Sequence, residues 1–255
     1  MRHLADARTA FRRLHEGFFV LPNAVTAGEA IKLAELGFPA LASTSHGLAL
    51  SLGKGDYTST LDETLANLRT LAAATQLPVN ADFEAGFAGD AAGVAANVAK
   101  AVEAGVAGLS IEDRAGDALL PPREAVGRIR AARDALDAAD RNLVLVGRTE
   151  GYLAGAPDLG KTIERLRAYS DAGADVLYAP GVSVPAEIKA IVEAVSPKPV
   201  NVILVSSQMR VGELKALGVR RVSVGGFLAT AAWSAFEAAA KSLREGGSLP
   251  DASFG

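Results

Sequence analysis

An unbroken alternation of two kinds of segment is the feature that most restricts the fold of this chain. Short apolar segments typical of buried strands occupy residues 18–23, 38–43, 78–82, 106–111, 143–148, 175–178, 199–203 and 221–224. A segment with helical spacing of its apolar residues follows each of them, at 26–36, 61–75, 90–104, 122–139, 159–172, 185–195, 210–217 and 227–243. Strands that are apolar throughout indicate a parallel sheet covered on both faces.

The ends of the expected helices carry residues that start and stop helices. Thr26, followed three residues later by Glu29, has the pattern of a capping box. Glycine stands just past the last turn of four helices, where a left-handed backbone ends the helix. These glycines are Gly37, Gly105, Gly173 and Gly218.

Eight strand–helix units within 255 residues predict one (β/α)8 barrel of the TIM type, an α/β fold that forms a single domain over residues 1–255. A further helix is expected before the first strand, at residues 4–16. An open, doubly wound sheet is the alternative fold, and it would usually carry a glycine fingerprint after its first strand. Residues 22–25, Pro-Asn-Ala-Val, show no such fingerprint.

The composition narrows the classes of function. The chain has no cysteine, which excludes disulfides, thiolate metal ligands and a cysteine acid or nucleophile. Its net charge of −3 provides no field for nucleic acid or an anionic membrane surface. The N-terminus has no signal-peptide pattern, and no run of about 18 apolar residues occurs, so we expect a cytoplasmic protein that spans no membrane.

Polar side chains end most of the expected strands. In a parallel barrel these strand ends face one mouth, where the active sites of such barrels lie. The residues are Asn23, Ser43 to His46, Asp82, Glu84, Glu112, Asp113, Arg148, Glu150 and Asn201. The sixth strand ends instead in the apolar segment 178–181. Acids and one arginine at successive strand ends indicate a divalent metal and an anionic ligand.

Asp82, Glu84 and Glu112 are the candidate metal ligands. Asp82 and Glu84 are two residues apart at a strand end, so both are expected on the same side of the strand. Carboxylate oxygens of this kind suit Mg²⁺, or Mn²⁺ in its place. Capping of the next helix or binding of a neighbouring loop remains an alternative role for each carboxylate.

Arg148 is the candidate for binding the anionic ligand, because its planar guanidinium suits a carboxylate. It could also pair structurally with Glu112 or Glu150. The segment 43–47, Ser-Thr-Ser-His-Gly, could cradle a carboxylate through its hydroxyl and backbone N–H groups, or be only a polar loop. Asp56 lies in a glycine-rich stretch that could form a mobile rim.

Five motifs, taken in order, resemble those of the isocitrate lyase / phosphoenolpyruvate mutase superfamily. They are Ser43–Ala49, Asn80–Gly86, Gly105–Asp113, Val146–Gly151 and Asp171–Asp175. Each motif is weak alone, whereas their order and spacing between Phe19 and about Ala240 are specific. The resemblance implies an α/β barrel that binds Mg²⁺ and a 2-oxo acid or its enolate.

The resemblance also implies roles for single residues. Asp82 would hold the metal, directly or through water, and Glu84 and Glu112 would complete the water shell. Arg148, Glu112 and Asp56 are predicted as catalytic. The substrate-binding residues would be Ser43, Thr44, Ser45, Arg148 and Asn201. Members of the superfamily commonly form tetramers, so we expect a homo-oligomer, a dimer or tetramer, in which the C-terminal helix is exchanged between subunits.

The segment after the fourth strand departs from the superfamily. Lyases carry a Lys-Cys-Gly-His-type motif in this gating loop, and mutases carry a Lys-Thr-Asn-Ser-type motif. Residues 113–121, Asp-Arg-Ala-Gly-Asp-Ala-Leu-Leu-Pro, contain neither Cys nor Lys. The departure argues against cleavage of isocitrate or methylisocitrate and against phosphonomutase chemistry.

The function predicted from the sequence is a Mg²⁺-dependent carbon–carbon lyase or decarboxylase that acts on a small 2-oxo di-acid such as oxaloacetate through a metal-stabilised enolate. Decarboxylation needs little beyond the metal, whereas other cleavages need a base, for which Glu150, Tyr178 and His46 are candidates. The alternatives are a hydrolase of a related keto acid and a 2-oxo acid binding protein or sensor without turnover.

Overall fold

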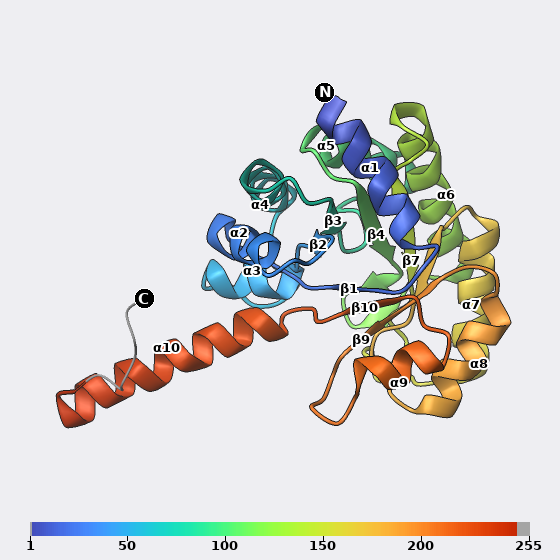
Figure 1. Cartoon of the computed structure of the whole chain (residues 1–255). Coiled ribbons are helices and arrows are strands. Elements are labelled where there is room, and N and C mark those ends of the chain that lie inside the picture. The colour runs from blue at the N-terminus through green and yellow to red at the C-terminus, as the bar shows by residue number, and fades with distance from the viewer. Residues whose placement is uncertain (1, 249–255) are drawn as a thin grey trace.

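The computed structural model describes residues 2–248 and confirms the barrel expected from the sequence (Figure 1). Eight parallel strands form one sheet in the order β1-β10-β9-β8-β7-β4-β3-β2. Their bounds are β1 Phe19–Leu21, β2 Leu41–Ala42, β3 Val79–Asp82, β4 Gly108–Glu112, β7 Val144–Arg148, β8 Val176–Tyr178, β9 Val200–Ile203 and β10 Arg221–Ser223. A parallel bridge between Asn23 and Ala42 joins the edge strands β1 and β2, so the sheet is nearly closed.

Seven helices wrap the outside of this sheet in the described part of the chain. They are α2 Ala27–Glu35, α4 Leu61–Ala74, α5 Ala91–Glu103, α6 Pro122–Ala139, α7 Leu159–Asp171, α8 Pro185–Val195 and α9 Val211–Ala216. Thr26 and Glu29 form the expected capping box at the start of α2. Gly105 and Gly173 follow α5 and α7 with φ of 98° and 104°, a backbone that favours glycine. The alternation of short strands and covering helices therefore brings all strand ends to one face.

The N-terminal helix α1 (Arg2–Leu14) seals the opposite end of the barrel. Phe11 is fully buried and packs with inward-facing residues of the strands. Arg12 pairs with Asp175 just before β8, with 3.0 Å between Nη1 and Oδ1, and Arg8 donates from Nε to the carbonyl of Val106 just before β4. Because these contacts lie where strands begin, only the carboxyl end of the barrel is left open.

Two segments at that open end are structured in ways the sequence did not reveal. The stretch expected as a polar loop enters a short helix, α3 (Ser45–Ser51), whose first turn is capped by the Thr44 side chain. The segment after β4 forms a small hairpin of β5 (Arg114–Ala115) and β6 (Ala118–Leu119). Both elements are too short for hydrophobic periodicity to identify them.

The last helix, α10 (Phe227–Gly246), leaves the barrel instead of packing on it (Figure 1). Ala229 is its one buried residue. Large apolar side chains along it are exposed, namely Phe227, Leu228, Trp233, Phe236 and Leu243. No helix within residues 2–248 combines the length and apolar character that a membrane span requires.

Candidate active site

A cavity of about 200 Å³ opens at the carboxyl ends of the strands. Seven of the residues predicted from the sequence line it: Ser43, Thr44, Ser45, Asp56, Asp82, Arg148 and Asn201. Glu84 and Glu112 are not in its lining, and Glu112 is only 3% exposed. Asp82 at the end of β3 and Arg148 at the end of β7 therefore face the cavity, and Glu112 lies behind them.

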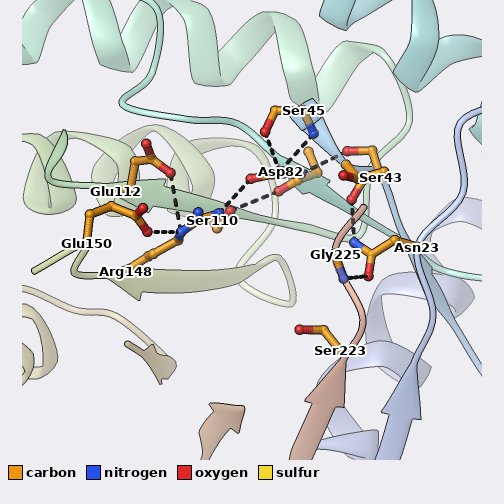
Figure 2. A network of polar contacts seen from close by, with 12 residues as sticks. Asn23, Ser43, Ser45, Asp82, Ser110, Glu112, Arg148, Glu150, Ser223 and Gly225 are labelled. Carbon is orange, nitrogen blue, oxygen red and sulfur yellow. Dashed lines mark hydrogen bonds and ion pairs between the residues drawn. The ribbon is translucent and has the colours of Figure 1, made fainter. Parts of the chain in front are cut away.

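Asp82, the last residue of β3, is held by three hydrogen bonds (Figure 2). Its Oδ2 accepts from the backbone N–H and the hydroxyl of Ser45, at 2.9 and 2.8 Å, and its Oδ1 accepts from Nη1 of Arg148 at 3.1 Å. The hydroxyl oxygen of Ser43 accepts from the Asp82 N–H at 2.9 Å, which leaves its own O–H to donate to a ligand. The carboxylate cradle expected at Ser45 thus already holds a carboxylate of the protein.

Arg148 lies among three carboxylates. Besides Asp82, its Nε contacts Glu150 and lies 3.3 Å from Oε2 of Glu112. Burial lowers the pKa of Arg148, but the charges of Glu112, Glu150 and Asp82 outweigh burial and raise the pKa above its ordinary value. The ring of Tyr178 lies 5.3 Å from the guanidinium carbon. Arg148 therefore both lines the cavity and makes the structural pairs that were its alternative role.

Glu84 and Glu112 each have a buried Oε1 atom without a hydrogen-bond partner among the described residues. Burial raises the pKa of Glu84 to about 7, assisted by the negative charges of Asp82 and Asp56. Burial also raises the pKa of Glu112, against the opposing charge of Arg148. Buried polar atoms are nearly always satisfied, so two such oxygens beside Asp82 point to a ligand that supplies their partners.

The position of Glu84 has a different cause from the one expected. β3 ends at Asp82, and Glu84 lies past it in a turn with φ of 45°, so strand alternation does not reach it. Within residues 2–248, no three His, Cys, Asp or Glu side chains are close enough together to bind one ion directly. This geometry fits Mg²⁺ that keeps several of its waters and takes one direct carboxylate better than it fits a dry three-carboxylate site.

Asp113 was expected at the mouth, and the structure corrects this. It is buried and accepts hydrogen bonds from the hydroxyls of Tyr169 and Thr149, at 2.6 and 2.7 Å, and from Arg165 at 3.1 Å. Successive side chains point to opposite sides of an extended chain, so Glu112 faces Arg148 while Asp113 faces α7. Asp113 also accepts from the N–H of Glu150 at 2.9 Å and thereby fixes that residue beside Arg148.

Two residues that the sequence did not single out cover the mouth. The hydroxyl of Tyr57 donates to Oε2 of Glu150 at 3.3 Å, and the guanidinium of Arg114 lies 4.5 Å from the centre of the Tyr57 ring. Tyr57 has a left-handed backbone with φ of 60°, which is uncommon for a residue with a side chain. Next to it, Asp56 lies 3.4 Å from Nδ1 of His46. The loop after α3 and the hairpin after β4 therefore meet over the cavity.

Comparisons with known proteins match the chain over most of its length. The family model for phosphoenolpyruvate phosphomutase matches residues 11–244. An oxaloacetate decarboxylase of Rhodopseudomonas palustris is 35% identical over 232 residues, which are 86% of this chain and 77% of that protein.

Solved structures agree with this match. A Burkholderia cenocepacia protein provisionally classed as a lyase or mutase superposes with a TM-score of 0.94 at 46% identity, covering 97% of this chain and 91% of that one. An oxaloacetate acetylhydrolase bound to its product oxalate superposes with a TM-score of 0.89 at 28% identity, covering 98% and 90% of the two chains. Sequence and backbone geometry therefore point to one group of enzymes.

Proposed function

The chain belongs to the phosphoenolpyruvate phosphomutase family and, with it, to the isocitrate lyase / phosphoenolpyruvate mutase superfamily, and from this premise we propose that it cleaves a carbon–carbon bond of a small 2-oxo di-acid with the help of Mg²⁺. Family membership confirms the resemblance read from the motifs and the prediction of an enzyme of the lyase class. The substrate and the metal are proposals that depend on the geometry of the site.

One observation carries the proposal: Glu84 and Glu112 each have an orphaned carboxylate oxygen, and besides burial the charge of Asp82, which faces the cavity, acts on both carboxyl groups and raises the pKa of each. Asp82 would hold the metal, and Glu84 and Glu112 would accept hydrogen bonds from its waters. A bound Mg²⁺ supplies Lewis-acid stabilisation of the negative charge that develops on the 2-oxo group. Loss of that charge stabilisation would cost several kcal/mol in the transition state.

The remaining residues of the site orient the substrate and exclude water. The Ser43 hydroxyl and the Thr44 and Arg148 side chains offer donors to a carboxylate next to the 2-oxo group. Tyr57 and Arg114 line the cavity beside them and shield part of it from water, which strengthens each of these contacts. The hairpin supplies no cysteine acid, so the proton that ends the reaction comes from solvent or from the ring of acids around Arg148.

Decarboxylation of oxaloacetate is the reaction that asks least of these residues, because carbon dioxide leaves without help from a base. The similarity to an oxaloacetate decarboxylase supports this branch. The similarity to an oxaloacetate acetylhydrolase supports hydrolytic cleavage of the same compound as the second candidate. The two branches give different products, pyruvate with carbon dioxide in the first case and oxalate with acetate in the second.

Product analysis tests the proposal. The protein is incubated with Mg²⁺ and oxaloacetate, and pyruvate, oxalate and acetate are measured by NMR. Heat-treated protein corrects for the metal-catalysed background decay of oxaloacetate. Turnover above this background that disappears with EDTA and returns with Mg²⁺ is the expected result. Saturable binding without turnover of oxaloacetate or of other 2-oxo and 2-hydroxy di-acids would replace the enzyme with a 2-oxo acid sensor.

We also propose that α10 packs on a second copy of the chain. Its exposed residues Phe227, Trp233 and Phe236 form an apolar surface that the barrel of the same chain does not cover. Light scattering should give a dimer or tetramer, and Phe236→Ser should shift it toward the monomer. A wild-type protein that is monomeric at micromolar concentration would contradict the exchange of this helix.

A further inference from the structure

Arg221 is a charged residue at the floor of the cavity to which neither the sequence nor the proposed reaction gives a role. It is the first residue of β10, only 3% of its surface is exposed, and it lines the cavity together with Asn201, its register partner on β9. Its guanidinium lies inside the barrel, between the helix α1 that seals the lower end and the open space above.

The neighbours of Arg221 carry no charge. Its Nε donates to Oδ1 of Asn201 at 2.9 Å, and its Nη1 lies 3.5 Å from Oδ1 of Asn80 and from Nε2 of His15. Nδ1 of His15 lies 2.9 Å from the carbonyl oxygen of Phe11 and donates to it, so Nε2 is the acceptor of a neutral ring. Burial lowers the pKa of His15 to about 3, which keeps the ring neutral at physiological pH.

The absence of a counterion sets Arg221 apart. In the described part of the chain, no carboxylate oxygen lies within 4.0 Å of its guanidinium. The two other arginines of similar burial, Arg8 and Arg128, pair with Asp140 and Glu124. A buried charge is normally paired, because desolvation without a partner is costly. An unpaired arginine that borders an open cavity is therefore prepared for an anion that enters the cavity.

The spacing of residues along β3 gives the distance between Arg221 and Asp82. Asn80, which contacts Arg221, and Asp82 are two residues apart on one strand and point to the same side. At the usual rise per residue, their side chains are separated by about 7 Å along the strand. A 2-oxo acid of four or five carbons, bound with its oxo group near Asp82, can place a terminal carboxylate at the guanidinium of Arg221.

We propose that Arg221 binds the carboxylate of the substrate that is remote from the oxo group and thereby selects 2-oxo di-acids over 2-oxo mono-acids. The inference rests on the proposed function and sharpens it. An ion pair with a carboxylate that departs as carbon dioxide would stabilise the ground state and be lost in the transition state. The carboxylate on Arg221 therefore stays on a product. For oxaloacetate this favours the second candidate of the proposed function, hydrolytic cleavage to oxalate and acetate, over decarboxylation.

Calorimetric titration with two stable ligands of matched length tests the proposal. In the presence of Mg²⁺, 2-oxoglutarate should bind wild-type protein about 100-fold more tightly than 2-oxovalerate, which has a methyl group in place of the remote carboxylate. Arg221→Met should remove this preference by weakening 2-oxoglutarate about 100-fold, while the affinity for 2-oxovalerate changes less than about threefold. Arg221→Lys keeps the charge without the planar fork and should lose about tenfold.

Arg220→Met is the matched control. Arg220 precedes Arg221, contacts the carbonyl of His15 and does not line the cavity, so its loss should leave both affinities unchanged. Equal affinity of wild-type protein for the two ligands, or equal weakening of both ligands by Arg221→Met, overturns the role of Arg221 and leaves the proposed function standing. A wild-type protein that binds neither these ligands nor oxaloacetate overturns the proposed function and the inference together.

Discussion

Two arginines reach the same cavity from different sides of the barrel, and their surroundings are opposite. Arg148 on β7 meets Asp82, Glu112 and Glu150, whereas Arg221 on β10 meets amides and a neutral histidine. With Arg148 counted, the first side keeps an excess of negative charge and suits a cation. The second side keeps a positive charge and suits an anion. One cavity of a barrel can thus present a negative side and a positive side on separate groups of strands.

Removal of Asp82 should have the largest effect, because it takes away the carboxylate at the end of β3 that faces the cavity and pairs with Arg148. We expect Asp82→Ala to lower turnover of oxaloacetate on the order of 1,000-fold and to abolish the dependence of ligand binding on Mg²⁺. Steady-state kinetics and titration with and without EDTA measure both. Unchanged metal-dependent binding in this variant would rule out Asp82 as a metal ligand.

Replacement of each arginine by methionine should change the free energy of unfolding by different amounts on the two sides. Arg148→Met leaves the buried Glu112 and Glu150 and the partly buried Asp82 without their cation and should lower the free energy of unfolding by about 3–5 kcal/mol. Arg221→Met removes a buried charge that has no counterion and should change the same quantity by no more than about 1 kcal/mol. Urea denaturation followed by circular dichroism measures both variants. Equal losses would show that the two surroundings do not differ in the way described.

The neutral His15 ring below Arg221 should cause a loss of stability at acidic pH. The pKa of His15 lies below its unfolded value of 6.5, so between these values the unfolded chain binds a proton that the folded chain does not. The contribution of the neutral His15 to the free energy of unfolding is complete above about pH 6.5. As the pH falls this contribution is lost, and at pH 4.5 the free energy of unfolding should be lower by about 2–3 kcal/mol. His15→Gln should flatten this part of the pH profile of unfolding. A profile identical to that of wild type would mean that His15 is already charged in the fold.

Loss of the hydrogen bond between Tyr57 and Glu150, on the side of Arg148, should have the smallest effect. Tyr57→Phe keeps the ring against Arg114 but removes the 3.3 Å hydrogen bond to Glu150. We expect about a tenfold fall in turnover, comparable with the net contribution of one hydrogen bond, and little change in stability. Steady-state kinetics at saturating oxaloacetate measure the effect. A loss as large as that of Asp82→Ala would give Tyr57 a role in the chemistry itself.

The sequence reveals one side of this comparison and not the other. Asp82 and Arg148 were found because they end strands, and strand ends of a parallel barrel meet at one mouth. Asn201, also predicted, is the second residue of β9 and lies on the side of Arg221. Arg221 begins its strand, so this rule does not select it. Its role depends on the length of its side chain and on the absence of an acid nearby, and both depend on which strands are neighbours across the barrel.

Local geometry accounts for the other differences. Asp113 was placed at the mouth by its position after β4, although the alternation that turns Glu112 inward must turn Asp113 outward. Glu84 reaches Asp82 through a turn with positive φ, which the sequence does not encode in a recognisable pattern for a non-glycine residue. Tyr57 covers the mouth because a loop and a hairpin distant in sequence touch. Hydrophobic periodicity along the chain predicts the fold, whereas these contacts depend on how the closed barrel brings distant segments together.

The single bridge at Asn23 means that backbone hydrogen bonding between neighbouring strands is weaker at this point of the barrel than elsewhere. Between β1 and β2, two backbone hydrogen bonds of 2.8 Å close the sheet, one from Ala24 to Ala42 and one from Ala42 to Pro22, whereas the β4–β7 ladder extends over five residue pairs. Amide protons at this seam should exchange with heavy water through local opening, well before those of β4 and β7. The side chain of Asn23 donates to the Ser43 carbonyl, so a ligand on Ser43 should slow that exchange and make the seam a sensitive reporter of occupancy.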